Sequence, residues 1–494
     1  MQSVSEAFTS ATEALVRLVQ TKLEVQWDGT NWTDESQYVR LHSGSTRFGQ
    51  TSDELVAPGS IAGAEVLLDS STNRFNWLRS DGPLYGYIGG DMGMYGIGAR
   101  LYVGFGGEYC RIFTGVIVTW EEGRGDVRLT LRDEGYRYLQ DKQSTVMYEQ
   151  ERTDSWVKRL CDWMGLPSGD QILDPGIFTI PYCWLDDESL IEEAWDVAAA
   201  EGGRCWIDAL GKLHFENVVH WLDAVHQAVQ WAFTEEDLVV TGPTSRTEDV
   251  ATTVIAEWSA RAVSGLAVVF TLQEEKVVAP GEALSFDARL NQPVLAYAAL
   301  TAGTDYSVQS SGGQDLAASV VIELIPAQQF AQRCRIAITN NHTTLAAHVG
   351  FLQIRGYPLL GSPAEQVEIV ADPPPLSFKR PRSVRGSPYL QTYAQAHALA
   401  AVLGARYQRL MRTWSLVGVA GVPQLELGDR VSFTDAKRIS DLIEGFVTQI
   451  QWQFAPDAGY IQNLEVLGAE DYFPTTGYFI IGTTALGAVG KCWY

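Results

Sequence analysis

The chain has 494 residues, of which 46% are hydrophobic and 19% charged, and this composition is typical of a globular protein. Its length exceeds what one hydrophobic core supports, so we expect several domains. The formal net charge of -24 opposes general binding to nucleic-acid phosphates, and we expect no specific DNA binding.

The sequence carries no sign of membrane insertion or of a metal-binding cysteine motif. No stretch reaches the roughly 18 consecutive apolar residues of a transmembrane helix, so we expect no transmembrane segment. The N-terminus lacks the basic and apolar regions of a signal peptide. The six cysteines form no Cys-x-x-Cys pair, and their apolar neighbours favour buried, reduced thiols.

The chain opens with residues 1–20, whose apolar spacing predicts an amphipathic helix. Two interpretations of this helix stay open: a lid on the following core, or a docking helix for a neighbouring subunit. Residues 21–143 are expected to form a β-domain, because short alternating runs are separated by turns such as Asp28-Gly29.

Residues 144–220 change character and predict a small α+β domain. One helix is expected at Asp154–Met164. A second is expected at Asp187–Glu201, with Asp186 and Asp187 at the positive end of its dipole. A hairpin follows, with its strands at 204–208 and 212–215.

Residues 221–370 predict a β-sandwich, because several alternating runs are separated by turn clusters. Strands are expected at 252–258, 267–272, 283–290, 319–324 and 335–339. Ala371-Asp-Pro-Pro-Pro375 is a linker, since consecutive prolines hold the chain extended. The basic run that follows is either a solvated loop or a contact with an acidic neighbouring subunit. Its residues are Lys379, Arg380 and Arg382.

Residues 371–470 predict a helix and a second β-domain. Ser387-Pro388 marks the helix start, and apolar residues then recur at helical spacing up to Met411. Phe446–Phe454 is a strand with aromatic residues on one face and glutamines on the other. We expect the aromatic face to be buried and the glutamines to meet water or a partner's polar groups. These glutamines are Gln449, Gln451 and Gln453.

The last stretch, residues 471–494, is too apolar to stand free in water. It is therefore expected to be an attachment segment that packs on a partner, with Trp493 near its end.

The order of these motifs resembles that of baseplate-hub (tail-tip) proteins of tailed bacteriophages, siphophage type. The closing turn at 423–431 reads Pro-x-Leu-x-Leu-Gly-Asp-x-Val and follows a helix, as in that family. The hairpin at 204–215 is similar to one in the family's small domain. The resemblance implies a mainly β, multidomain fold with two related hub β-barrels, a small α+β domain and an inserted β-sandwich.

The resemblance also implies a function. A structural hub would form a ring that joins the end of the tail tube to the tip and fibres during host attachment and DNA delivery. The implied assembly is a homotrimer, whose two barrels per chain offer six near-equivalent positions. Its implied partners are distal tail or tail tube proteins, the tape-measure protein and tail fibre or central spike proteins. The implied location is the virion tail tip, after assembly in the bacterial host cytoplasm.

Catalytic chemistry is not predicted from the sequence. His214, His220 and His226 lie six residues apart, which matches neither a helix face nor the His-Glu-x-x-His zinc pattern. We therefore expect no enzyme activity, no metal and no cofactor. Two alternatives stay open. A glycan-binding or glycan-cleaving β-protein would show exposed aromatic platforms beside paired carboxylates, and the hub of a contractile injection system would share the fold.

Overall fold

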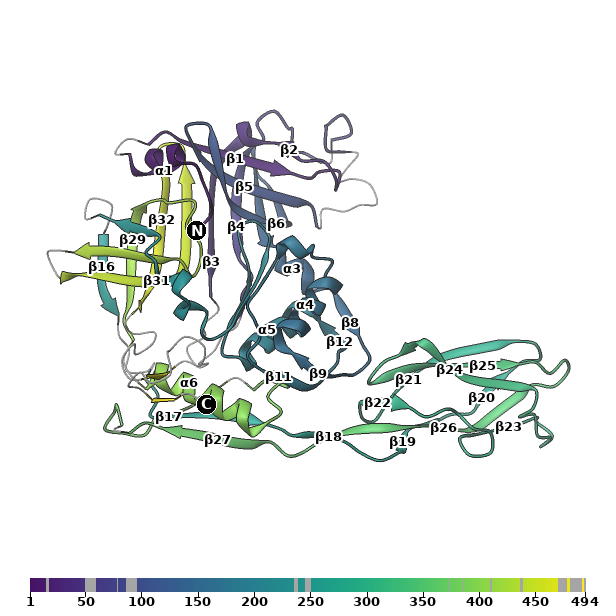
Figure 1. Cartoon of the computed structure of the whole chain (residues 1–494). Helices are drawn as coiled ribbons and strands as arrows, with labels where there is room; N and C mark the ends of the chain where they lie inside the picture. Colours follow the sequence, from purple (N-terminus) through teal and green to yellow (C-terminus); the bar gives the residue numbers. More distant parts are fainter. Residues whose placement is uncertain are drawn as a thin grey trace.

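The computed structural model describes residues 1–494 except 15–16, 49–58, 78, 86–95, 235–238, 245–249, 373, 385, 409–410, 436–438, 470–477, 480–490 and 493–494. A body of β-structure and three longer helices carries a narrow arm that projects to one side (Figure 1). Most elements are strands, so the expected mainly β, multidomain fold is confirmed.

One 13-stranded sheet dominates the body. Its N-terminal unit runs in the order β2-β1-β5-β6-β7-β4-β3, with neighbouring strands antiparallel. The short helix η1 (Ser36–Tyr38) lies between β2 and β3. The strands of this unit are β1 (Val19–Val25), β2 (Thr33–Asp34), β3 (Val39–Arg47), β4 (Gly63–Asp69), β5 (Gly98–Phe105), β6 (Glu108–Glu122) and β7 (Asp126–Asp133).

The C-terminal unit of the same sheet continues from β3 through β31 to β32, β29 and β16. β30 pairs with β31 and, in parallel, with β15. Two of its strands, β15 and β16, come from the stretch expected to belong to the β-sandwich. The two units are joined in one sheet through the pairing of β3 with β31. The strands of this unit are β15 (Trp231–Phe233), β16 (Val239–Thr244), β29 (Thr413–Ala420), β30 (Arg430–Asp435), β31 (Ile439–Ala455) and β32 (Gly459–Gly468).

The two units also share one hydrophobic core. Leu101 and Phe113 of the N-terminal unit belong to the same buried cluster as Ile450 and Trp452 of β31. The N-terminal segment ties the units together, because the Gln2 N–H donates to the Gln424 carbonyl at 2.9 Å. Burial of this common core makes the pair of units one structural body.

The N-terminal helix α1 spans only Glu6–Glu13, so it is shorter than the expected 20 residues. Ser5 caps it by accepting a hydrogen bond from the Phe8 N–H. Phe8 is buried and meets Phe105 edge-on, with 5.4 Å between ring centroids. The helix therefore covers the core of the N-terminal unit, as the lid interpretation expected.

The small α+β domain packs below the sheet. Its helix α4 (Thr153–Trp163) and hairpin β13–β14 match the sequence prediction. The second helix, α5 (Leu190–Ala200), starts later than expected, since Asp186 and Asp187 belong to strand β12, which pairs with β8. Other elements are α3 (Gly135–Tyr138), β8 (Lys142–Ser144), β9 (Tyr148–Arg152), η2 (Ser168–Asp170), β10 (Gln171–Leu173), β11 (Thr179–Cys183), β12 (Asp186–Ser189), β13 (Arg204–Ile207), β14 (Leu213–Glu216), η3 (His220–Leu222) and η4 (Ala224–Gln227).

Helix α6 (Tyr393–Tyr407) covers one face of a three-stranded sheet at the bottom of the body (Figure 1). The helix begins after Thr392, which forms a capping box with Gln395, and not at the expected Ser387-Pro388. The capping box satisfies backbone donors of the first turn of the helix. The sheet consists of β17 (Thr253–Trp258), β27 (Glu365–Val370) and β28 (Pro381–Ser383).

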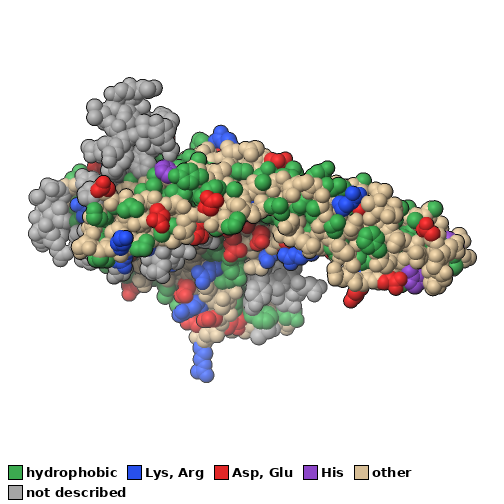
Figure 2. All heavy atoms as spheres, turned by 90° about the horizontal axis from the view of Figure 1, so that it is seen from below, with side chains coloured by type: hydrophobic (Ala, Val, Ile, Leu, Met, Phe, Trp, Pro, Cys, Tyr) green, Lys and Arg blue, Asp and Glu red, His purple; other side chains and the backbone are tan. Residues whose placement is uncertain are grey.

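The arm is a β-sandwich inserted between β17 and β27, and Figure 2 shows it reaching well beyond the body when viewed from below. A three-stranded sheet, β21-β25-β24, packs on the strands that pair with the long β26. The arm's strands are β18 (Arg261–Val263), β19 (Ala267–Thr271), β20 (Lys276–Val278), β21 (Ala283–Arg289), β22 (Val294–Tyr297), β23 (Tyr306–Gln309), β24 (Val320–Gln329), β25 (Arg333–Asn340) and β26 (Ala347–Gly361).

Two further features complete the fold. The five cysteines whose side chains the structure describes are buried and unpaired, as expected. Beyond residue 470, β33 (Tyr478–Phe479) pairs in parallel with β34 (Lys491–Cys492), while the rest of the expected attachment segment lies outside the described residues. Among the described helices, none has the length and apolar character needed to cross a membrane.

Candidate assembly surface

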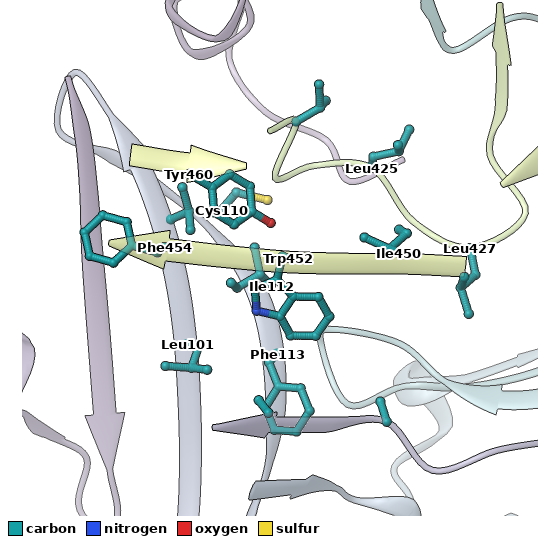
Figure 3. Packing of buried hydrophobic residues seen from close by; sticks show 14 of the residues in the cluster. Leu101, Cys110, Ile112, Phe113, Leu425, Leu427, Ile450, Trp452, Phe454 and Tyr460 are labelled. Carbon is teal, nitrogen blue, oxygen red and sulfur yellow. The ribbon is translucent and has the colours of Figure 1, made fainter. Parts of the chain in front are cut away.

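Strand β31 has the two-faced pattern that the sequence predicted. Ile450, Trp452 and Phe454 are buried, whereas Gln451 and Gln453 are exposed. Figure 3 shows Trp452 among buried residues of both β-units, with Phe113 of β6 nearby. The ring centroids of Phe113 and Trp452 are 6.3 Å apart. The aromatic face is therefore part of the common core, and the glutamines point outward.

Strand β31 lies inside the sheet, paired with β3 on one side and β32 on the other. Gln451 stands opposite Ser45 of β3, and Gln453 stands opposite Ser43. The half-buried Gln449 stands opposite Arg47. Because the backbone of β31 is already paired on both sides, a partner at this surface would meet side chains rather than an open strand edge.

Two rows of side chains cross five strands on the outer face. They follow from the register of β7, β4, β3, β31 and β32. A hollow of about 450 Å³ lies over these rows. We call this hollow and the two rows the polar seam. The first row holds Arg132, Gly63, Ser45, Gln451 and Asn463, and the second holds Thr130, Glu65, Ser43, Gln453 and Ile461.

The hollow exists because the strands carry small residues where the two units join. Gly44 faces the core, and its backbone lies directly against the Trp452 indole. A methyl group added at Gly44 would collide with that ring and lie 2.7 Å from the Gly63 carbonyl oxygen. On the outer face, Gly63 likewise leaves room for the neighbouring Arg132 side chain. Small residues thus let the indole close the core beneath the polar seam.

The polar seam is nearly neutral in a strongly acidic protein. Among the residues that line its hollow, only Glu65 and Arg132 ionise, and their charges are opposite. Residues 142–225 by contrast carry sixteen acidic and six basic side chains. Serine, glutamine, asparagine and threonine offer donors and acceptors without net charge. The polar seam is therefore suited to hydrogen-bonded contact with another acidic protein.

The remaining residues proposed for the interface do not join the polar seam. Lys379 is exposed just before β28, and Arg382 lies within that strand, which belongs to the separate sheet below α6. Arg380 is held next to β17, where its N–H donates to Thr252 Oγ1 at 2.7 Å. Of the basic run, Arg382 thus lies in the edge strand β28, and Lys379 and Arg380 precede that strand. Trp493 lies outside the described residues.

Two of the three histidines singled out from the sequence, His214 and His220, lie beside carboxylates. His214 Nε2 lies 3.0 Å from Asp208 Oδ2, and its ring stacks on Trp206. His220 sits between Asp174 at 2.8 Å and Glu216 at 3.3 Å. Burial opposes the charge on His220, but these carboxylates raise its pKa overall. Across the described part of the chain, no group of three or more His, Cys, Asp or Glu side chains could hold a metal ion.

His226 stacks on His220, with ring centroids 3.9 Å apart, and has a lowered pKa because of burial and the neighbouring imidazole. Sequence spacing did not predict this pairing, since the fold and not a helix face brings the rings together. The stack lies at the crossing between the α+β domain and the C-terminal unit, next to Trp221, whose ring stacks on Phe446.

Two buried carboxyl groups lie beneath the polar seam. Asp133 and Glu426 line a small pocket of about 40 Å³ where the two β-units meet the α+β domain. Burial raises the pKa of each to about 7. Asp133 accepts hydrogen bonds from the backbone N–H groups of Ala62 and Gly135. Through these contacts Asp133 holds the backbone at the start of β4, which is a structural role.

Comparison with known proteins gives similarities of structure alone. No family model matches the chain, and no curated protein matches it. A tail protein from Neisseria meningitidis MC58 is 11% identical, with 92% of this chain and 100% of that chain covered and a TM-score of 0.44. The 43 kDa tail protein of prophage MuSo2 from Shewanella oneidensis is 10% identical, with 92% and 98% covered and a TM-score of 0.46.

A third similar structure is an Escherichia coli component of the type VI secretion system, described as similar to the T4 bacteriophage tail proteins gp27 and gp5. It is 10% identical, with 88% of this chain and 75% of that chain covered and a TM-score of 0.38. The solved structures that resemble this chain thus include tail proteins.

Proposed function

We propose that the chain is a structural subunit of a bacteriophage tail, a hub that forms a homotrimeric ring at the tail tip. The observation that supports this proposal is the polar seam, where two β-units meet in one sheet. Two units held side by side in each subunit give a trimer six positions around its axis. Such a ring can adapt a six-fold tube to a three-fold tip.

Charge supports the choice of the polar seam as the contact between copies. Subunits that each carry a formal charge of -24 repel one another at long range. A surface with one Glu65, one Arg132 and otherwise neutral polar groups adds little to this repulsion on contact. Glutamine side chains on neighbouring copies can donate and accept in turn, which suits a repeated, self-complementary seam.

In the proposed hub, the partners are the tail tube end, the tape-measure protein and the fibre or central spike proteins. The ring would act in the virion after assembly in the host cytoplasm. We propose no enzymatic role. The alternative of a glycan-binding groove is not favoured at the polar seam, because the one aromatic residue among those lining the hollow, Trp452, is only 5% exposed.

The test is the oligomeric state of wild type and of Gln451→Glu, measured by sedimentation or light scattering across a range of salt concentration. We expect a trimer for the wild type. The added carboxylate should weaken the trimer at low salt, and screening should partly restore it near physiological ionic strength, where the Debye length is about 8 Å. Gln309→Glu is the matched control, since this exposed glutamine lies on β23 of the arm.

Three outcomes bear directly on the proposal. A trimer weakened by Gln451→Glu and unaffected by Gln309→Glu supports it. A wild type that stays monomeric at every salt concentration, together with one copy per assembled tail, contradicts it. A trimer that responds equally to both variants would place the contact elsewhere.

A further inference from the structure

The arm is attached to the body by two short connections. Residues 259–260 lead from β17 into β18, and residues 362–364 lead from β26 back into β27. The connections are held to each other, because Ser259 Oγ donates to the Ser362 carbonyl at 2.7 Å and the Ser362 N–H donates to the Ala260 carbonyl at 2.8 Å. The two adjacent connections, built of small residues and a proline, form a narrow joint, visible where β18 leaves the body in Figure 1.

The near end of the arm also touches the α+β domain at a second place, far from this joint in the sequence. The Ala331 N–H donates to the Thr145 carbonyl at 2.7 Å. The Trp184 indole Nε1–H donates to Gln332 Oε1 at 3.1 Å. These two hydrogen bonds connect the turn between β24 and β25 with the segments before β9 and after β11.

An apolar contact accompanies these hydrogen bonds. Met147 of the body and Ala331 and Leu359 of the arm form a buried cluster that is separate from the other hydrophobic clusters. The Arg261 guanidinium, at the start of β18, lies over the Trp184 ring at 4.6 Å. We call these contacts the latch. Half-buried residues around the cluster are Tyr182, Trp184, Val263 and Leu295.

A weak ion pair completes the latch. Arg289 Nη2 lies 3.2 Å from Asp186 Oδ2, but the Arg289 side chain is 82% exposed. Exposed pairs of this kind contribute little, because water and salt screen them. The latch therefore depends on two hydrogen bonds, the contact of Arg261 with the Trp184 ring and a small apolar cluster.

We propose that the arm is a hinged element that moves between a closed position, held by the latch, and an open one. Opening at the joint would break the latch while leaving the arm's own core and the α+β core intact, because the latch cluster is separate from both. Local openings of this kind require less free energy than unfolding of a packed core. Hinges commonly use a few element-terminal residues, as at 259–260 and 362–364.

The hinge gives the arm a mechanical role that goes beyond a ring-forming hub. A partner that pulls on the far end of the arm shifts the equilibrium toward the open position, since the arm acts as a lever about the joint. The α+β domain carries half of the latch, so opening of the arm also changes the contacts of Thr145 and Trp184 in the body. This inference does not depend on the oligomeric state.

The test is hydrogen exchange of the full chain, read at the Ala331 amide. Ala331 lies in a turn and is 1% exposed, and its N–H is bonded only across the latch, so its protection reports the closed position. The amides of Ile336 and Ile338, in the arm's central strand β25, report unfolding of the arm core. We expect Ala331 to exchange at least tenfold faster than these two amides in the wild type.

Variants sharpen this measurement. Trp184→Phe keeps an aromatic ring but removes the indole donor, and Gln332→Ala removes its acceptor. Each should speed exchange at Ala331 about fivefold, the equivalent of one net hydrogen bond, without changing exchange in β25. Gln353→Ala is the matched control, because Gln353 Nε2 donates to the Thr304 carbonyl within the arm. It should leave Ala331 exchange unchanged.

The wild-type comparison decides the matter even if a variant folds poorly. Ala331 exchanging at the same rate as Ile336 and Ile338 would overturn the proposal, because the contact would then open only when the arm unfolds. Spin labels at Ser285 on the arm and Glu192 on α5, both exposed, add a second readout. A longer distance that gains population in Trp184→Phe supports the hinge, and one unchanged distance in every variant counts against it.

Discussion

Gly44→Ala is the substitution that tests most directly whether the two β-units are one packed body. The added methyl group would lie 2.7 Å from Cε2 of Trp452 and 2.7 Å from the Gly63 carbonyl oxygen. Carbon atoms pack best at about 3.5–4.0 Å, so the indole or strand β3 would have to move by roughly 1 Å. Neither moves freely, because Trp452 is 5% exposed and Gly63 is held in the ladder between β3 and β7.

The expected cost follows from overpacking. Extra methyl groups in well-packed cores destabilise by about 1–3 kcal/mol. Alanine also restricts the unfolded chain, which offsets about 0.4–1 kcal/mol of this cost. We therefore expect the free energy of unfolding to fall by about 1–2 kcal/mol. Trp452→Phe removes the part of the indole that meets the methyl group, so the double variant should be more stable than the two single effects predict by at least about 0.5 kcal/mol.

The assay is denaturant unfolding, with local stability at the joint read from hydrogen exchange of the β3 and β31 amides. Gly350→Ala is the control, because this strand glycine in the arm has no atom within 4 Å of an added methyl group. An unfolding free energy for Gly44→Ala within about 0.5 kcal/mol of wild type, or strictly additive effects with Trp452→Phe, would show that the close packing of β3 on β31 is not as described.

Two further predictions concern stability. Burial raises the pKa of Asp133, Glu193, Glu201 and Glu426 to about 7, so the folded chain holds protons that the unfolded chain releases above its ordinary carboxyl pKa. This stabilisation is complete only below the ordinary carboxyl pKa and is lost progressively as pH rises from there to about 7. The melting temperature should therefore be lower at pH 8 than at pH 6, with a smaller difference in Glu193→Gln. A higher value at pH 8 would contradict the burial argument. Thr392→Ala removes the capping box of α6 and should lower the free energy of unfolding by about 0.5–2 kcal/mol, measured by denaturant unfolding. Ser383→Ala, at an exposed position on β28, is the control. Equal stability of the two variants would show that the cap does not stabilise the helix.

Local patterns in the sequence predicted most strands, because burial on one face imposes alternation whatever the partner strand is. The glutamine and aromatic faces of β31 are the clearest example. The acidic residues Asp186 and Asp187 were expected to open a helix, since they complement its dipole, yet they lie in strand β12, where Asp186 pairs with Ser144 of β8. Asp187 adopts a positive φ of 66° at the irregularity in that pairing, and tertiary pairing outweighs the local preference.

The pairing of strands far apart in the chain could not be predicted from local sequence patterns. β15 pairs in parallel with β30 across about two hundred residues, so it was assigned to the sandwich instead of the C-terminal unit. The glutamines of β31 were expected to face outward, but nothing local indicated that Ser43 and Ser45 of β3 would stand opposite them. The sequence thus predicted the contribution of β31 to the polar seam, and only the fold shows that four other strands contribute to it.

The origin of the polar seam in distant parts of the chain has a consequence for assembly. β3 ends at Arg47 and β31 begins at Ile439, so their pairing closes a loop that contains the α+β domain and the arm. Contacts between residues so far apart form late, because the loop entropy must be overcome before the pairing stabilises it. The arm has a core of its own and needs no such closure, whereas the core of the α+β domain also contains residues of β17, β27 and α6 from both sides of the arm in the sequence. The polar seam is therefore complete only when the whole chain has folded. A trimer built on it would form from fully folded subunits and not from partly folded ones.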